Sequence, residues 1–189
     1  MKNTDFHLLS NLPTYSDDGV VNAVVEAPKG SLVKIRYDTK LGVFTVSHAL
    51  SLGLSYPFDW GFVPSTLAPD GDPLDVLILH DGATYPGVLL PCQPLGVVEM
   101  DQDETEGKRE RNDRIIVMPS WQDRLGEFER ASDLPERLRK EIEQFFLSTT
   151  FFTAKNPKIL GWKGPKRASE IIKKTHNAYL LEAGHLAKK

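Results

Sequence analysis

Cysteine is almost missing from this chain of 189 residues, in which Cys92 is the single example. One thiol cannot form an internal disulfide, so we expect a reducing compartment, the cytoplasm. Cys92 follows Leu89-Leu90-Pro91, and this apolar setting predicts a buried, inert thiol rather than a nucleophile.

Long apolar runs and a large excess of one charge are also lacking. No stretch approaches the roughly 20 apolar residues of a membrane span, and residues 1–10 hold no apolar segment of signal-peptide length. The net charge is only −3, which argues against a surface devoted to nucleic acid. We therefore expect neither a membrane nor a nucleic acid as a partner.

The order of the sequence patterns predicts one α+β domain over residues 1–189. Residues 1–19 are polar with turn signals and form a lead-in segment, after which short strand-like runs are separated by Gly, Pro and Asp. These runs are Val20–Ala27, Leu32–Tyr37, Val43–Val46, Leu74–Leu79, Leu95–Met100 and Ile115–Met118. Strands in such succession indicate a small barrel or closed sheet, and helical patterns follow them.

Two C-terminal helices are predicted from the spacing of apolar residues. We expect Ser132 or Asp133 to cap the first, with Pro135 in its first turn. Its apolar face comprises Leu134, Leu138, Ile142 and Phe145. The second is expected from about residue 165 to 183 with Gly184 as the stop, after a turn at 161–165. Its inward face comprises Ala168, Ile171, Ile172, Thr175 and Tyr179.

The most informative segment is Asp70-Gly71-Asp72-Pro73-Leu74-Asp75, where three aspartates crowd into six residues ahead of an apolar run. Like charges at this spacing repel one another unless water or cations screen them. Asp75 shares a strand face with Leu77 and Leu79, so its charge needs a partner or a metal. Carboxylates favour hard cations, Mg²⁺ above all, and predict metal-assisted chemistry on a phosphate compound. The alternative is an ordinary turn followed by an edge-strand charge.

Cationic and aromatic side chains provide candidate substrate contacts. Lys34 and Arg36 share one face of a predicted strand and can bind phosphate, or simply face solvent. Tyr56 and Trp60 can offer an O–H and an N–H to an anion, or belong to a rigid packing loop. His48 follows a strand-like run, where a lone histidine is more often structural than catalytic.

The heptad Asp70–Val76 resembles the signature of the soluble, family I inorganic pyrophosphatases. Further motifs resemble that family in the same order along the chain: Val25-Glu26-Ala27-Pro28, Tyr56–Pro64, Pro94-Leu95-Gly96-Val97, Phe145-Phe146 and Gly161-Trp162. The resemblance covers roughly residues 20–182. It implies a five-stranded, OB-like β-barrel with flanking helices. It also implies hydrolysis of pyrophosphate to two phosphates by a metal-activated water, with several Mg²⁺ ions per site.

The resemblance further implies a role for each matching residue. Asp70 and Asp75 would hold the two metals that share the attacking water, and Asp72 would be the general base. Glu26 would lie in the outer metal shell, and Lys34 would grip the phosphate. Paired metals and positioned charges suit phosphoryl transfer, which needs little covalent help from the protein.

Several phosphate-binding positions depart from the family pattern. Tyr56 is kept and would hydrogen-bond within the acidic site. Arg36 replaces a metal-shell glutamate, His48 replaces a phosphate-binding arginine, and Trp60 replaces a tyrosine. A Tyr-Lys pair that holds the outgoing phosphate aligns with Thr149-Thr150.

The charged segment 101–113 departs from the family as well. It is either a solvated loop or part of the site, and it is longer than in the family. Counting back from Pro119 places Asn112 at a metal-binding aspartate and Arg114 at a lysine, although a small bulge would bring Asp113 into the metal position instead. Asp103-Glu104 would supply another loop acid. Arg36 and Arg114 would compensate for lost cations in a rearranged phosphate pocket.

Three functions stay open at this point. The first is a divergent, Mg²⁺-dependent inorganic pyrophosphatase acting on pyrophosphate or a related small phosphate compound. The second keeps the metal centre and changes the substrate to another phosphoanhydride or phosphoester. The third is a catalytically silent binding protein on the same fold, although such a protein has no physical need for three crowded carboxylates. The resemblance also implies a homo-oligomer.

Overall fold

The computed structural model describes residues 8–103, 107–121 and 128–186. Its strands are β1 (Val21–Ala27), β2 (Val33–Asp38), β3 (Val43–Ala49), β4 (Asp59–Val63), β5 (Leu74–Ile78), β6 (Leu89–Asp103), β7 (Arg109–Arg111), β8 (Arg114–Pro119) and β9 (Lys158–Lys163). Its helices are α1 (Glu136–Ser148) and α2 (Pro165–Leu186), with short 3-10 turns at Leu9–Asn11 and Ala131–Asp133.

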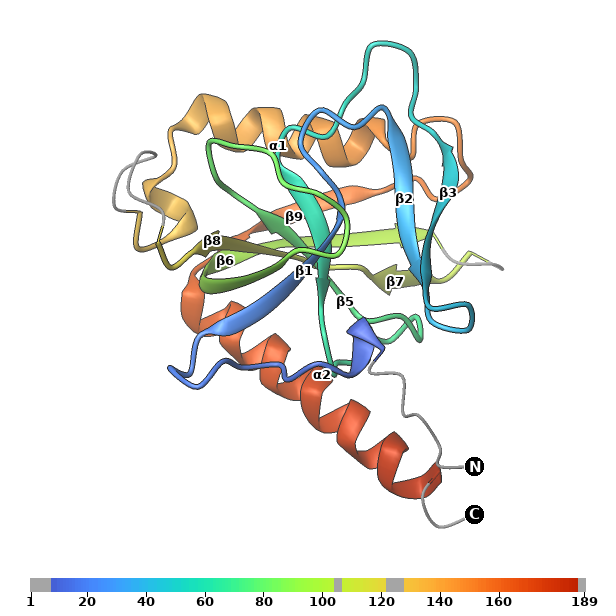
Figure 1. Ribbon diagram of the computed structural model, residues 1–189. Helices are drawn as coiled ribbons and strands as arrows, with labels where there is room; N and C mark the ends of the chain where they lie inside the picture. The colour runs from blue at the N-terminus through green and yellow to red at the C-terminus, as the bar shows by residue number, and fades with distance from the viewer. Residues whose placement is uncertain (1–7, 104–106, 122–127, 187–189) are drawn as a thin grey trace.

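Five strands close into a ring (Figure 1). The pairings run from β1 to β4, β5, β8 and β6, and β6 returns to β1. The β5–β8 pair is parallel and the other four pairs are antiparallel. Closure removes the exposed edges that an open sheet would present. The predicted α+β fold with a small closed sheet is therefore confirmed.

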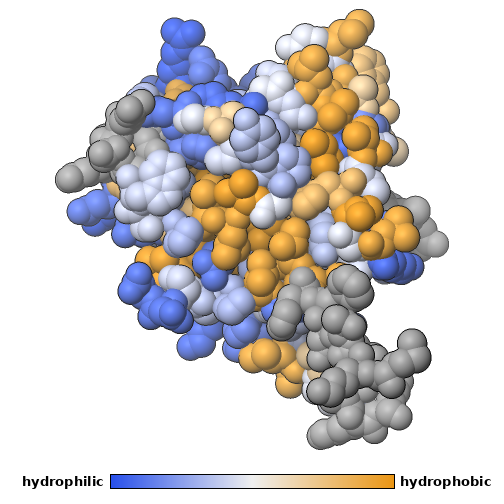
Figure 2. Space-filling model, viewed as in Figure 1, coloured by the Kyte–Doolittle hydropathy of each residue, from blue (hydrophilic) through white to orange (hydrophobic). Residues whose placement is uncertain are grey.

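Strand β6 is long enough to organise the remaining sheet. Its 15 residues also pair with β7 and β9, which extend the ring on one side. The hairpin β2–β3 forms a separate two-stranded sheet that stands over the ring (Figure 1). Five apolar side chains on this hairpin and its flanking loops are exposed, namely Leu32, Leu41, Val43, Val46 and Leu52. Figure 2 shows hydrophobic surface in this part of the molecule.

The two helices pack against different apolar clusters at opposite ends of the ring (Figure 1). Helix α1 contributes Ile142, Phe145 and Phe146 to the cluster that contains Leu77. Helix α2 contributes Ala168 and Ile172 to the other cluster. The predicted inward faces of both helices are thus confirmed. No helix of the described chain is long and apolar enough to cross a membrane.

Helix α2 begins at Pro165 as predicted, but the predicted start of α1 and the predicted end of α2 were wrong. Asp133 accepts the Arg130 backbone N–H through its carboxylate and so closes the 3-10 turn, and Pro135 is the N-cap of α1. Leu134 is extended because a following proline disfavours the helical conformation. Helix α2 continues through Gly184, because the helix propensity of the neighbouring residues offsets the unfavourable propensity of glycine.

Two strands lie where loops or turns were expected. Strand β4 occupies the aromatic segment that resembled a packing loop, and all five of its residues are buried. Gly61 lies in this strand because a Cβ there would sit 1.8 Å from the Val24 carbonyl oxygen. Strand β9 continues through the expected turn to Lys163, so that only Gly164 separates it from α2.

Cys92 is fully buried in strand β6, as predicted. Its thiol donates to the Leu90 carbonyl oxygen at 3.3 Å, and burial raises the pKa of the thiol well above its usual value. A thiol held in the neutral form is a poor nucleophile, so the expected inert character follows from its position.

Candidate active site

One cavity of about 670 Å³, between the β2–β3 hairpin and the start of β5, is lined by Asp38 and by four predicted acidic residues. They are Glu26, Asp70, Asp72 and Asp75, and the predicted substrate residues Lys34, Arg36, Trp60 and Arg114 line the same cavity. The structure therefore brings together eight of the twelve residues predicted for the site. Strands β1, β2, β4, β5 and β8 all contribute to its walls.

The acidic turn owes its shape to backbone chemistry. Gly71 has φ of +84°, a conformation that glycine adopts without steric cost. The Asp72 backbone N–H donates to Asp70 Oδ1 at 3.2 Å, which holds the two aspartates on one tight turn. Asp75 follows on β5, on the strand face of the buried Leu77 and Leu79. The alternation predicted from the sequence thus places the Asp75 carboxylate at the mouth of the core.

Two arginines neutralise part of this acidic cluster. Arg114 donates to Asp75 Oδ2, and Arg36 Nη2 lies 3.1 Å from Asp72 Oδ2. Arg114 also donates to the Asn112 side-chain oxygen and lies 5.3 Å from the Trp60 ring centroid. Each guanidinium retains donors beyond its carboxylate partner, so both are placed to bind a phosphate that enters the cavity.

Burial raises the pKa of two acids in the cavity, Glu26 and Asp75. It raises the pKa of Glu26 to about 7, against the lowering effect of the Tyr37 N–H, which donates to Glu26 Oε1 at 2.7 Å. Burial also raises the pKa of Asp75 above its usual value, against the opposing charges of Arg114 and Lys34. A cation bound beside these buried carboxylates would stabilise their charged forms and lower their pKa again.

The remaining predicted substrate residues lie next to the acidic cavity. Tyr56 and His48 line an adjoining cavity together with Lys34 and Trp60. Burial lowers the pKa of Lys34, while the nearby Asp75 opposes that shift. Tyr56 is 4% exposed and stacks within the core, whereas His48 is exposed on β3.

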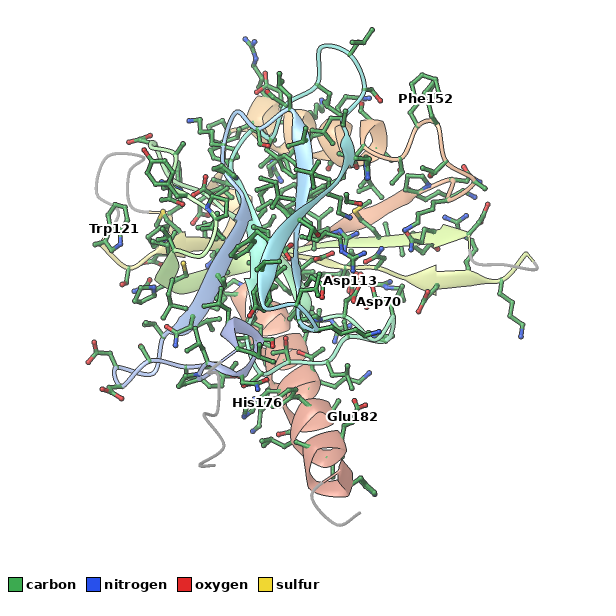
Figure 3. All side chains as sticks on the ribbon, turned by 45° about the vertical axis from the view of Figure 1, so that its right-hand side comes forward. Asp70, Asp113, Trp121, Phe152, His176 and Glu182 are labelled. Carbon is green, nitrogen blue, oxygen red and sulfur yellow. The ribbon has the colours of Figure 1, made fainter. Side chains whose placement is uncertain are left out.

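Two predicted metal ligands lie outside the acidic cavity. Asp103 pairs with Arg109 and accepts from the Asn156 side chain at 3.1 Å. Asp113 accepts the Met100 backbone N–H at 3.1 Å and pairs with Arg111. Asp113 lines instead a groove beside α2, which also reaches Asp70 (Figure 3). The expected bulge is absent here, because the β6–β8 register shifts only between Pro94 and Gly96. Glu104 lies outside the described residues.

Asn112, which the sequence offered only as the alternative to Asp113, and Lys155, which it did not predict, both line the two cavities. Asp113 points toward the Met100 N–H, and its neighbour Asn112 faces the cavity because consecutive residues of an extended backbone point to opposite sides. The count back from Pro119 had already pointed to it. Lys155 lies in a polar segment before β9, where no periodicity or motif distinguishes it from a solvated lysine.

Comparison with known proteins identifies the family of this arrangement. The sequence profile described as "Inorganic pyrophosphatase" matches residues 23–180. The chain belongs to the inorganic pyrophosphatase family. An inorganic pyrophosphatase of Nostoc sp. is 33% identical over 171 residues, which cover 90% of this chain and 98% of that protein. A Thermus thermophilus relative is 36% identical over 157 residues, covering 82% of this chain and 87% of its own.

Solved inorganic pyrophosphatase structures share the fold. The crystal structure of the Thermus thermophilus enzyme aligns with a TM-score of 0.83 at 34% identity, covering 91% of this chain and 98% of that chain. The Neisseria gonorrhoeae inorganic pyrophosphatase aligns with a TM-score of 0.81 at 31% identity, covering 90% and 98%. The resemblance drawn from the acidic heptad is therefore confirmed, and with it the metal-dependent hydrolase family.

The carboxylates fit divalent cations by their chemistry and by their common cavity. Within residues 8–103, 107–121 and 128–186, no three Asp, Glu, His or Cys side chains gather closely enough to enclose one ion. Mg²⁺ commonly binds through one or two carboxylates together with water and substrate phosphates, rather than in a closed protein cage. Asp70, Asp72 and Asp75 would therefore suit divalent cations that take their remaining ligands from water.

Proposed function

We propose that this protein hydrolyses inorganic pyrophosphate to two phosphates with Mg²⁺ as its metal. The observation that carries the proposal is the convergence of Asp70, Asp72 and Asp75 on one cavity with Lys34 and two arginines. A phosphoryl-transfer site needs carboxylates that bind metal ions and basic side chains that bind the phosphate groups.

The residues divide the work by position. Asp70, Asp75 and Glu26 would hold the cations, which when bound neutralise substrate charge and lower the pKa of water. Asp72 is exposed on the turn, so its Oδ2 atom can accept the proton of the attacking water once Arg36 turns toward the phosphate. Lys34 and Arg114 line the same cavity and would bind phosphate oxygens there. Positioning of this kind supplies most of the catalysis in phosphoryl transfer.

The direct test is phosphate release from pyrophosphate with Mg²⁺, with Ca²⁺ and with a chelator. The proposal predicts fast release with Mg²⁺ and a return to background after chelation. Phosphate release that continues after chelation would show that the reaction does not need the metal. Mg²⁺-dependent stabilisation without any release would favour the silent binding protein on the same fold.

A homo-oligomer and a cytoplasmic location complete the proposal. The exposed apolar side chains of the β2–β3 hairpin support association, since surfaces of this kind commonly mark interfaces (Figure 2). Light scattering coupled to size exclusion measures the mass in solution, and a mass near 21.2 kDa would contradict association. The single buried cysteine suits a reducing compartment.

A further inference from the structure

A second cavity, of about 170 Å³, adjoins the acidic cavity. The two share parts of their walls, formed by Lys34, Trp60, Asn112, Arg114 and Lys155. A substrate bound at the aspartates can therefore extend into the second cavity without leaving the site.

The residues that line only the second cavity are mostly uncharged. Its apolar wall comprises Leu50, Tyr56, Met100, Phe145 and Phe146. Thr149 and Thr150 lie at its edge, and their hydroxyls donate to the Phe146 and Leu147 carbonyl oxygens at the end of α1. Among these unshared residues, His48 is the one basic side chain, and it lies exposed on β3.

The aromatic wall is already formed by side chains that pack against one another. The ring centroids of Tyr56 and Phe145 lie 5.2 Å apart, and those of Trp60 and Phe146 lie 6.0 Å apart. These rings belong to the same core cluster as Leu77, so they do not have to rearrange to accept a ligand. A cavity of about 150 Å³ lined by apolar side chains can hold a benzene ring.

The mostly uncharged wall of the second cavity affects a phosphate group and an uncharged ring differently. A second phosphate group would have to share Lys34, Arg114 and Lys155 with the phosphate at the aspartates, and the part that lies against the apolar rings would lose its hydration, which is costly. An uncharged ring would gain from the removal of its apolar surface from water. The second cavity therefore favours an organic group over a second bare phosphate.

We infer that the site accepts organic diphosphates in which a ring-sized apolar group on the leaving phosphate occupies the second cavity. The inference rests on the proposed function and names a wider substrate class for the same site. In the reaction, the water oxygen bonds to the terminal phosphorus and the bond from that phosphorus to the bridging oxygen breaks. The bridging oxygen leaves with the organic monophosphate, and Asp72 takes the proton of the water.

Binding separates this inference from catalysis. The probes are the benzyl and methyl monoesters of methylenediphosphonate, which cannot be hydrolysed at the P–C–P bridge, titrated by calorimetry with Mg²⁺ present. We expect the benzyl ester to bind at least tenfold more tightly than the methyl ester. Equal affinities would overturn the inference.

Two matched variants test whether the preference for the benzyl ester arises in the second cavity. Thr149→Phe fills the cavity and is expected to abolish the benzyl-over-methyl ratio. Ser148→Phe adds the same ring one residue earlier, on the side of α1 that lines a different surface groove with Phe152, and should keep the ratio. A ratio that survives Thr149→Phe, or that is lost equally in both variants, would contradict the assignment.

Hydrolysis then distinguishes the two proposals. Release of phosphate from pyrophosphate, without a benzyl preference in binding, would sink the inference and leave the proposed function intact. A benzyl preference without release of phosphate from any diphosphate would sink the proposed function and the catalytic part of the inference together. A benzyl preference accompanied by release of benzyl phosphate from benzyl diphosphate would support both.

Discussion

The buried pair of Asp59 and His80 is expected to be a main source of stability for the strands that carry the site. Asp59 begins β4, which also carries Trp60, and His80 follows β5, which carries Asp75. Both side chains are almost fully buried, with exposures of 0% and 2%. Loss of their contact is therefore expected to loosen the β4–β5 pair as well.

The carboxylate of Asp59 accepts three hydrogen bonds. His80 Nε2 lies 2.8 Å and Thr84 Oγ1 lies 2.6 Å from Asp59 Oδ2, and the Lys29 N–H donates to Oδ1 at 2.7 Å. Asp59→Ala removes the acceptor for all three donors, and breaking a buried polar pair of this kind costs about 3–5 kcal/mol. For a chain of this size we expect the melting temperature to fall by about 10 °C.

Urea unfolding at pH 7 measures the loss directly. The matched control is Asp18→Ala, which changes an exposed aspartate on a turn and should stay within about 0.5 kcal/mol of the parent. A loss below about 1 kcal/mol for Asp59→Ala, with an unchanged urea dependence, would refute the reasoning.

The same pair predicts a dependence on pH. Burial acts to raise the pKa of Asp59, but the hydrogen bonds from His80, Thr84 and Lys29 outweigh it and hold the pKa below its usual value. A lowered pKa means that the stabilisation is present above the unfolded-state value of about 4 and is lost as the pH falls further. The difference in unfolding free energy between the parent and Asp59→Ala should therefore shrink below about pH 4.

Three further changes test the site and its scaffold. Arg36→Ala should raise KM for pyrophosphate about ten- to hundredfold through the loss of a charged donor, whereas Arg137→Ala on the exposed face of α1 should leave KM unchanged. Mg²⁺ should raise the melting temperature of the parent, and Asp75→Asn should abolish that shift; a full shift in the variant would place the ion elsewhere. Gly61→Ala should cost about 3 kcal/mol in urea unfolding because the new Cβ meets the Val24 carbonyl oxygen, and a neutral result would mean that β1 and β4 separate easily.

Local patterns predicted much of the fold because they reflect contacts close in sequence. Alternation along one strand placed Asp75 on the face of Leu77, and helical spacing placed Phe145 and Ile172 inward. Strand β4 was missed because it is short and flanked by prolines. Its burial on both faces also removes the alternation that marks a half-buried strand.

Long-range pairing decided what local patterns could not. The sequence offered both Asn112 and Asp113 for one position, and the choice depended on the register of β8 against β6. That register places Asn112 in the cavity and directs Asp113 to the Met100 N–H. The Asp59–His80 contact joins residues 21 apart, and Lys155 reaches the cavity from a segment without any pattern.

The measurement that tests the central claim most directly is phosphate release from pyrophosphate with Mg²⁺, compared between the parent and Asp72→Asn. Asp72 is exposed, so this nearly isosteric change should leave the fold and the melting temperature intact. The proposed role predicts fast release by the parent and a fall of at least a hundredfold in kcat for the variant. Equal kcat values, or no release by a folded parent that binds Mg²⁺, would contradict the account.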